Sequence, residues 1–276
     1  MSHTFVKPLP RGLKLFDVSL RDGLQTWKRI PTLNEKKNIL RNIANIKNVK
    51  NVEVGSLVSS KIYPQFNDSI ELYHYTYKTY RHLTPYLLVP NLKMHQRALF
   101  NRICNMSFIT SVSNDFQLKN TKMTLEETKK QLKEMIDLTP GYKKIYISCV
   151  NECPINGIIN NDKIIQEILQ YIKLPVQEIC ISDTCGTLTK DTTEEILDIL
   201  LPIMQLNGIS IDKLSLHLHR NKNFNETKNI INHCLNRYIT KFDVSYIQGG
   251  GCSVTINEDK INDNLHYNDF DFDMML

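Results

Sequence analysis

Two histidines in the last third of the chain have the spacing of a metal-binding pair. His217 and His219 lie two residues apart within the apolar segment LSLHLHR, residues 214–220. Because side chains alternate along a strand, both imidazoles are expected on one face, where they could chelate a divalent cation. The alternative is a histidine pair packed in the core, and the HxH spacing alone does not exclude it.

An oxygen ligand could come from the polar turn that carries Arg21, Asp22 and Gln25. The preceding residues, 13–18, have the apolar pattern of a buried strand, and Gly23 allows the chain to turn sharply. Charged side chains at the end of a buried strand are unfavourable unless they bind a partner, although a structural Arg–Asp ion pair is the alternative. With two imidazoles, the Asp22 carboxylate would form a mixed site suited to Mg²⁺, Mn²⁺ or Zn²⁺.

Three further side chains have types that suit chemistry. Cys252 follows the glycines 249–251, a setting that favours a reactive thiol over a spare buried cysteine. Glu53 lies inside an apolar segment and Asp183 ends another, and an unpaired charge in either place would be unfavourable. For both acids the alternative is a salt bridge that lines the protein interior.

The elements that must position these residues repeat along the chain. Short apolar strands alternate with helical patterns at intervals of about 30 residues, as expected for parallel strands covered by helices. Capping boxes at residues 32–35 and 124–127 predict the starts of two of the helices. We expect strands at residues 13–18, 51–57, 86–90, 106–113, 144–150, 178–184, 214–219 and 242–247.

Eight such units over roughly 250 residues match the size of a closed (β/α)8 TIM barrel of the α/β class. An open doubly wound sheet is less consistent, because no glycine-rich nucleotide motif follows an early strand. No linker divides the chain, so we expect a single TIM-barrel domain over residues 1–276. The C-terminal strand ends of such a barrel share one mouth, which would gather Arg21, Asp22, Glu53, Asp183, His217, His219 and Cys252.

Composition excludes several other classes of protein. The chain has 276 residues, of which 41% are apolar and 23% charged, as in globular proteins. The net charge of +5 is modest and the basic residues are dispersed, which argues against nucleic-acid binding. We find no membrane span or secretory signal, so we expect a cytoplasmic protein that does not bind membranes. The seven cysteines lack paired CxxC motifs, which argues against a zinc ribbon and a disulfide scaffold.

These motifs together resemble the 3-hydroxy-3-methylglutaryl-CoA lyase family, which is related to the isopropylmalate and homocitrate synthases. LRDG and HxH alone would fit those synthases too, whereas the SxVSxKxxPQ segment, VPNLK and the GGGC loop point to the lyases. The matching segments occur in the family's order: DVSLRDGLQ at 17–25, VEVGSLVSSKIYPQ at 52–65, LVPNLK at 88–93, YISCVNECPINGII at 146–159, ISDTCG at 181–186, LHLH at 216–219 and GGGC at 249–252.

The resemblance implies a retro-Claisen cleavage of 3-hydroxy-3-methylglutaryl-CoA to acetyl-CoA and acetoacetate. It implies that Asp22, His217 and His219 hold Mg²⁺ or Mn²⁺ and that Arg21 stabilises the enolate on the thioester oxygen. Glu53 would orient Arg21 or the metal-bound groups. The hydroxyl proton would pass to His217 or Asp183. Cys252 would protonate the acetyl-CoA enolate, and Gln25 would help to bind the acyl-CoA substrate.

The chain also departs from the family pattern around one edge of the site. The family has Asp-Thr-Tyr-Gly after the histidines, whereas Arg220 begins the corresponding stretch here, and Ser113-Asn-Asp replaces an acidic SxSE segment. The loop after the cysteine is expected to be shortened, so that Asn257 takes the place of the family's asparagine ligand. The chain also ends soon after strand eight, without the helical tail of relatives, which predicts a truncated C-terminal region.

These departures leave two other functions open. A barrel that binds a metal or another ligand, or that interacts with a partner, could have lost lyase turnover. A related aldolase or acyltransferase acting on a different substrate would keep the same metal ligands. Relatives are commonly dimers, so the resemblance also implies a homodimer.

Overall fold

Eight parallel strands form a closed barrel in the part of the chain that the structure describes. This computed structural model describes residues 12–46, 48–220, 223–251, 254–255 and 262–270. The barrel order is β1-β10-β9-β8-β5-β4-β3-β2, which confirms the predicted (β/α)8 barrel. The barrel strands are β1 (Lys14–Asp17), β2 (Val49–Ser56), β3 (Thr84–Leu88), β4 (Met106–Ser111), β5 (Lys143–Ser148), β8 (Glu178–Asp183), β9 (Leu214–Leu218) and β10 (Lys241–Val244).

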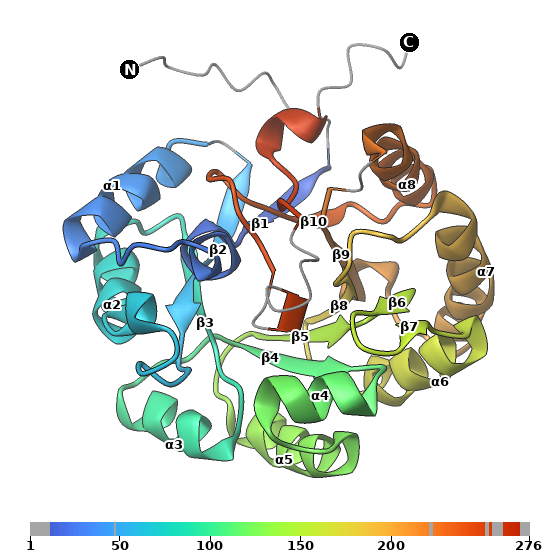
Figure 1. Cartoon of the computed structure of the whole chain (residues 1–276), viewed down its shortest axis with the longest axis horizontal. Helices are drawn as coiled ribbons and strands as arrows, with labels where there is room; N and C mark the ends of the chain where they lie inside the picture. Colours follow the sequence, from blue (N-terminus) through green and yellow to red (C-terminus); the bar gives the residue numbers. More distant parts are fainter. Residues whose placement is uncertain (1–11, 47, 221–222, 252–253, 256–261, 271–276) are drawn as a thin grey trace.

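Helices lie around the outside of this ring of strands (Figure 1). The side chains of Thr32 and Thr124 each accept a hydrogen bond from the main-chain N–H three residues later, which confirms both predicted capping boxes. None of the described helices combines the length and apolar character needed to cross a bilayer. The helices are α1 (Leu33–Ala44), α2 (Ser69–Thr79), α3 (Leu92–Phe100), α4 (Asn114–Thr121), α5 (Leu125–Leu138), α6 (Asn161–Ile172), α7 (Lys190–Leu206) and α8 (Phe224–Asn236).

Two features interrupt the regular alternation of strand and helix. Helix α4 is an additional helix between β4 and α5, and its N-cap Ser113 accepts a hydrogen bond from the main chain of Phe116. After β5, a small antiparallel hairpin joins β6 (Glu152–Cys153) to β7 (Gly157–Ile158). The sequence predicted neither of these elements.

The barrel interior contains a buried ion cluster. The ammonium of Lys144 pairs with Asp243 and lies 2.8 Å from the Glu178 carboxylate, although its side chain is only 1% exposed. The ammonium also lies 3.8 Å from the centroid of the Phe16 ring. Burial disfavours the charge, but the two carboxylates outweigh this effect and raise the pKa of Lys144. The cluster therefore fills the barrel with paired charges rather than apolar side chains alone.

The last described segment, residues 262–270, packs back onto the barrel. Asn264 forms an antiparallel bridge with His219, next to the end of β9. The main-chain N–H of Ser245, just after β10, donates to the carbonyl of Leu265 at 2.7 Å. The segment ends in the 3-10 helix Tyr267–Phe270, whose Tyr267 hydroxyl donates to Asp17 at 2.7 Å. Part of the chain beyond the eighth barrel strand therefore contributes to the barrel's structure.

Candidate metal centre and active site

The predicted polar turn after β1 is a single π-helical turn, Ser19–Gly23, whose residues are all buried. It places Arg21 and Asp22 in the wall of a cavity that is also lined by Tyr146, His217 and His219. Isolated π turns are frequent at functional sites because they change the direction of one or two side chains. The π-helical turn and the end of β9 therefore bring together Asp22 and His217, which are almost 200 positions apart in the sequence.

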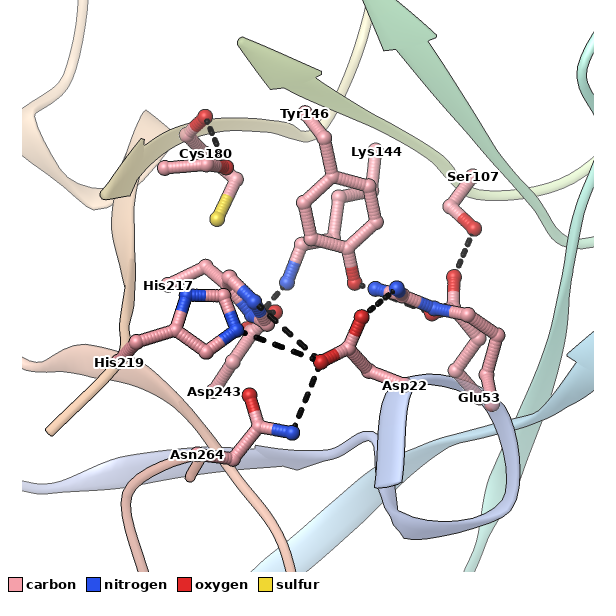
Figure 2. Close-up of polar contacts among 12 residues, drawn as sticks. Asp22, Glu53, Ser107, Lys144, Tyr146, Cys180, His217, His219, Asp243 and Asn264 are labelled. Atoms are coloured by element: carbon pink, nitrogen blue, oxygen red, sulfur yellow. Dashed lines mark hydrogen bonds and ion pairs between the residues drawn. The ribbon is translucent and has the colours of Figure 1, made fainter. Parts of the chain in front are cut away.

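Asp22 and the two histidines form a cluster with the dimensions of a metal site. Their potential ligand atoms all lie within 4.8 Å of one another. The Asp22 Oδ2 atom is 3.9 Å from Nε2 of His217 and 3.5 Å from Nε2 of His219. Figure 2 shows the carboxylate of Asp22 facing both imidazoles. The same-face arrangement expected from the HxH spacing is present in the structure.

Hydrogen bonds orient both imidazoles. Nδ1 of His217 lies 3.2 Å from Oδ2 of Asp243, and Nδ1 of His219 lies 2.8 Å from the main-chain oxygen of Asp183. Because these acceptors require a proton on each Nδ1, each Nε2 keeps a lone pair directed toward Asp22. Among the described residues, Nε2 of His219 has no hydrogen-bond partner. A buried acceptor of this kind suits a cation.

The electrostatics of the cluster favour an ionised carboxylate and at least one neutral imidazole. Burial would raise the pKa of Asp22, but Arg21 and the two histidines outweigh it and hold that pKa well below its usual range. Burial lowers the pKa of His217, whereas in His219 the neighbouring Asp22 outweighs burial and raises the pKa. Asp22 is therefore ionised, and His217 neutral, near neutral pH.

Arg21 is held between two acids. Its Nε donates to Glu53 and its Nη1 to Asp22, and its guanidinium carbon lies 5.1 Å from the centroid of the Tyr146 ring. Burial disfavours the charge, but Glu53 and Asp22 keep the pKa of Arg21 well above its ordinary value. Glu53 also accepts a hydrogen bond from Ser107. The guanidinium is therefore charged and fixed in orientation.

Asn264 belongs to the cluster, although the sequence did not single it out. Its Nδ2 donates to Oδ2 of Asp22 and to the carbonyl of Gly249, both at 2.9 Å, and Figure 2 shows it beside Asp22. Its Oδ1 is buried and has no hydrogen-bond partner among the described residues. The bridge to His219 that positions it has no local sequence signal. Only the family's expected asparagine ligand could have directed attention to this part of an Asn-rich segment.

The sequence analysis also did not identify Asp243, although the sequence contains a signal for it. A charged residue within a short apolar strand is unfavourable unless it is paired, and Asp243 is the acidic residue of β10. Burial would raise its pKa, but Lys144 and His217 outweigh burial and lower it. Applied to β10, the argument made for Glu53 would have identified Asp243 as a candidate.

Asp183 and Gln25, like Glu53, are not part of the cavity lining. The carboxylate of Asp183 accepts hydrogen bonds from the main chain of Thr187 at 3.0 Å and Leu188 at 3.2 Å. Burial raises the pKa of Asp183 to about 6. The Gln25 amide donates to the Tyr63 hydroxyl at 3.3 Å. The structure therefore places Asp183 beside His219 through its main chain and Gln25 against a neighbouring loop.

The predicted Cys252 and Asn257 lie outside the described residues. Gly251, the residue before Cys252, lines the cavity and donates its main-chain N–H to Oδ2 of Asp22 at 3.1 Å. In Gly249, φ is +127°, and an added Cβ would lie 2.6 Å from the carbonyl oxygen of Gly23. Glycine at position 249 therefore allows this loop to approach the π-helical turn closely.

The sequence of this chain is similar to those of known lyases. A mitochondrial hydroxymethylglutaryl-CoA lyase of Arabidopsis thaliana is 26% identical over 222 residues, which are 79% of this chain and 46% of that protein. This chain thus spans about half the length of that relative. A 3-hydroxy-3-isohexenylglutaryl-CoA/hydroxymethylglutaryl-CoA lyase of Pseudomonas aeruginosa is 24% identical over 247 residues, 88% of this chain and 79% of that one.

The fold is also similar to that of solved HMG-CoA lyases. The HMG-CoA lyase of Brucella melitensis superposes with a TM-score of 0.80 at 25% identity, over 92% of this chain and 87% of that one. The family model described as HMGL-like matches residues 12–224, well over half of the sequence. The matched region contains β1 to β9, including the π-helical turn and both histidines. The chain therefore belongs to the HMGL-like family.

Proposed function

We propose that this protein is a divalent-metal-dependent carbon–carbon lyase that cleaves 3-hydroxy-3-methylglutaryl-CoA to acetyl-CoA and acetoacetate. The observation that carries the proposal is the convergence of Asp22, His217 and His219 beside the fixed guanidinium of Arg21 in one cavity. A cation and a neighbouring positive charge suit a reaction in which one oxygen loses a proton while another gains negative charge.

The residues present fit Mg²⁺ or Mn²⁺. Asp22, His217 and His219 would supply one oxygen and two nitrogen ligands, and Asn264 would supply its unpartnered Oδ1 as a further oxygen. A mixed set of this kind leaves coordination positions for substrate oxygens. When bound, the metal would polarise the substrate's 3-hydroxyl and make its proton more acidic.

Arg21 would act on the fragment that leaves as acetyl-CoA. As the carbon–carbon bond breaks, its electron pair moves into that fragment and places negative charge on the thioester oxygen. The guanidinium would stabilise this charge, and its ion pair with Glu53 fixes the direction in which it points. Glu53 is thus a positioning residue, supported in turn by Ser107.

Two proton transfers complete the reaction. We assign the acceptor of the hydroxyl proton to Asp183, because Nε2 of His217 would be committed to the cation. The raised pKa of Asp183, about 6, suits a base that acts near neutral pH. Cys252 would give a proton to the enolate carbon, which yields acetyl-CoA, while the other fragment becomes acetoacetate. The position of its neighbour Gly251 in the cavity lining supports this role.

The substituent on C3 of the acyl group has two candidates. The Pseudomonas relative is named for an isohexenyl as well as a methyl substrate, so a longer 3-substituent is a related candidate. Gln25 would contribute to substrate binding, and its side chain is held by a hydrogen bond to the Tyr63 hydroxyl of a neighbouring loop. A cytoplasmic location and a homodimer stay predictions from the sequence.

Product analysis tests the proposal. Purified protein is incubated with 3-hydroxy-3-methylglutaryl-CoA and Mg²⁺ or Mn²⁺, and acetyl-CoA and acetoacetate are quantified. We expect the two products in equal amounts, and none with Asp22→Asn. Metal binding without any product from the methyl or isohexenyl substrate would contradict lyase activity and leave a ligand-binding barrel as the function.

A further inference from the structure

The 262–270 segment is fixed to the barrel at several points around Asn264. On its N-terminal side, the Asn262 amide donates to the carbonyl of Cys185 at 2.7 Å, and the Asp263 carboxylate accepts the N–H of Gly249 at 2.9 Å. On its C-terminal side, the Tyr267 hydroxyl donates to Asp17. These contacts join the segment to the loops after β8 and β10 and to the end of β1.

Arg220 fixes the same segment from both sides of Asn264. Its main-chain N–H donates to the carbonyl of Asp263 at 2.7 Å. Its guanidinium makes a two-pronged ion pair with Asp269, in which Nε lies 2.9 Å from Oδ2. The Asp269 side chain is only 4% exposed and also accepts the N–H of His266 at 2.7 Å. A planar guanidinium paired in this way restrains orientation as well as distance.

The guanidinium of Arg220 is directed at Asp269, within the protein itself. Both of its bonded nitrogens face Asp269, and the guanidinium carbon lies 5.1 Å from the centroid of the Phe224 ring. Its charge is therefore used within the protein. What it holds in place is the short stretch of chain that carries Asn264 to the Asp22 carboxylate.

We infer that Arg220, through its ion pair with Asp269, is a positioning residue that holds Asn264 in the metal site. This inference rests on the proposed metal-dependent function. In the sequence, Arg220 directly follows the ligand candidate His219. Its partner Asp269 lies five residues after Asn264. Arg220 thus connects the histidine strand to the segment that supplies the oxygen ligand, and it acts on the metal only through Asn264.

Mn²⁺ binding, measured by electron paramagnetic resonance of the free ion, tests this inference without any need for turnover. Four proteins are compared: the natural chain, Arg220→Gln, Asn264→Ala and the double variant. Arg237→Gln is the matched control, because Arg237 pairs with Asp198 and touches none of the site residues. Thermal unfolding of each protein is recorded so that affinity is compared only below the unfolding transition.

We expect Arg220→Gln to weaken Mn²⁺ binding about 10- to 100-fold, as for other residues that orient metal ligands, and Arg237→Gln to leave it unchanged. In the Asn264→Ala background, Arg220→Gln should cause no further loss, because the effect passes through Asn264. An equal loss in both backgrounds, or none in either, overturns the inference while leaving the metal site intact. If the natural chain binds no Mn²⁺, the inference and the proposed function fail together.

Discussion

Oδ2 of Asp243 lies 3.2 Å from Nδ1 of His217, while the other carboxylate oxygen of Asp243 pairs with the buried ammonium of Lys144. The two contacts connect the ion cluster inside the barrel to the candidate metal centre at its mouth. Because Asp243 accepts the Nδ1 proton, Nε2 of His217 is the nitrogen that remains for a cation. The barrel interior therefore determines how a candidate metal ligand is oriented.

Asp243→Asn tests this connection. An amide can place its NH₂ group toward Nδ1 and stabilise the wrong tautomer, so we expect Mn²⁺ affinity to fall about 10- to 100-fold. Lys144 would keep Glu178 as its partner but lose its closest carboxylate, which should also lower the unfolding free energy by roughly 3 kcal/mol. Titration calorimetry with Mn²⁺ and urea unfolding measure the two effects. Unchanged affinity would show that His217 does not depend on Asp243.

Arg21→Lys tests the guanidinium. Lysine keeps the charge but cannot bond Glu53 and Asp22 simultaneously in the same fork geometry, so the charge is no longer aimed at one position. We expect kcat for carbon–carbon bond cleavage to fall about 10²- to 10³-fold, as when other preorganised donors are removed. Steady-state kinetics provide the measurement, with the exposed Arg29→Lys as control. A kcat within threefold of the natural value would remove Arg21 from the mechanism.

Asp183→Asn tests the proposed proton acceptor. Thr187 and Leu188 donate to different oxygens of Asp183, so asparagine can accept only one of these two main-chain hydrogen bonds through its carbonyl oxygen, and it cannot take a proton. We expect kcat to fall about 10²- to 10⁴-fold with Mn²⁺ affinity preserved. A loss of less than about tenfold would remove Asp183 from the proton transfer.

Asp17 provides a pH test of the barrel outside the site. Burial raises its pKa from 3.8 to about 6, despite hydrogen bonds from Tyr267 and Ser19. The folded state therefore binds this proton more tightly than the unfolded state, so the contribution of Asp17 to stability decreases as pH rises from about 4 to about 6. The shift corresponds to roughly 3 kcal/mol.

Asp17→Asn should remove that pH dependence. Urea unfolding at pH 4, 5, 6 and 7 gives the difference in unfolding free energy between variant and natural protein, in which other titrating groups cancel. Between pH 4 and pH 7, we expect the unfolding free energy of the variant to rise by roughly 3 kcal/mol relative to that of the natural protein. A difference that is constant with pH would mean that Asp17 has an ordinary pKa in the folded protein.

The barrel was predictable from sequence because its signals are local. Each buried strand is a short apolar run, and each capping box at Thr32 and Thr124 depends on residues only three positions apart. The HxH spacing correctly predicted that His217 and His219 face the same way, because alternation is a property of any strand. Fold class and three clustered side chains followed from these short-range rules.

Other features depend on contacts that sequence spacing does not reveal. Asn264 reaches Asp22 across 242 positions, by way of a bridge to His219. Helix α4 has an amphipathic pattern too weak to recognise, and the β6–β7 hairpin has only two residues in each strand. The positioning role of Arg220 could not be predicted from the sequence, because its partner Asp269 is 49 residues away.

The most direct test of metal-dependent cleavage is the initial rate of 3-hydroxy-3-methylglutaryl-CoA breakdown as Mn²⁺ is returned to chelator-treated protein. We predict no turnover without metal and a saturable rate, half-maximal at the Mn²⁺ concentration that half-fills the site. We also predict a loss of at least about 10²-fold in His217→Ala at the same metal concentration. Cleavage that persists after chelation, or saturation with Mn²⁺ that produces no cleavage, would contradict metal-dependent lyase activity.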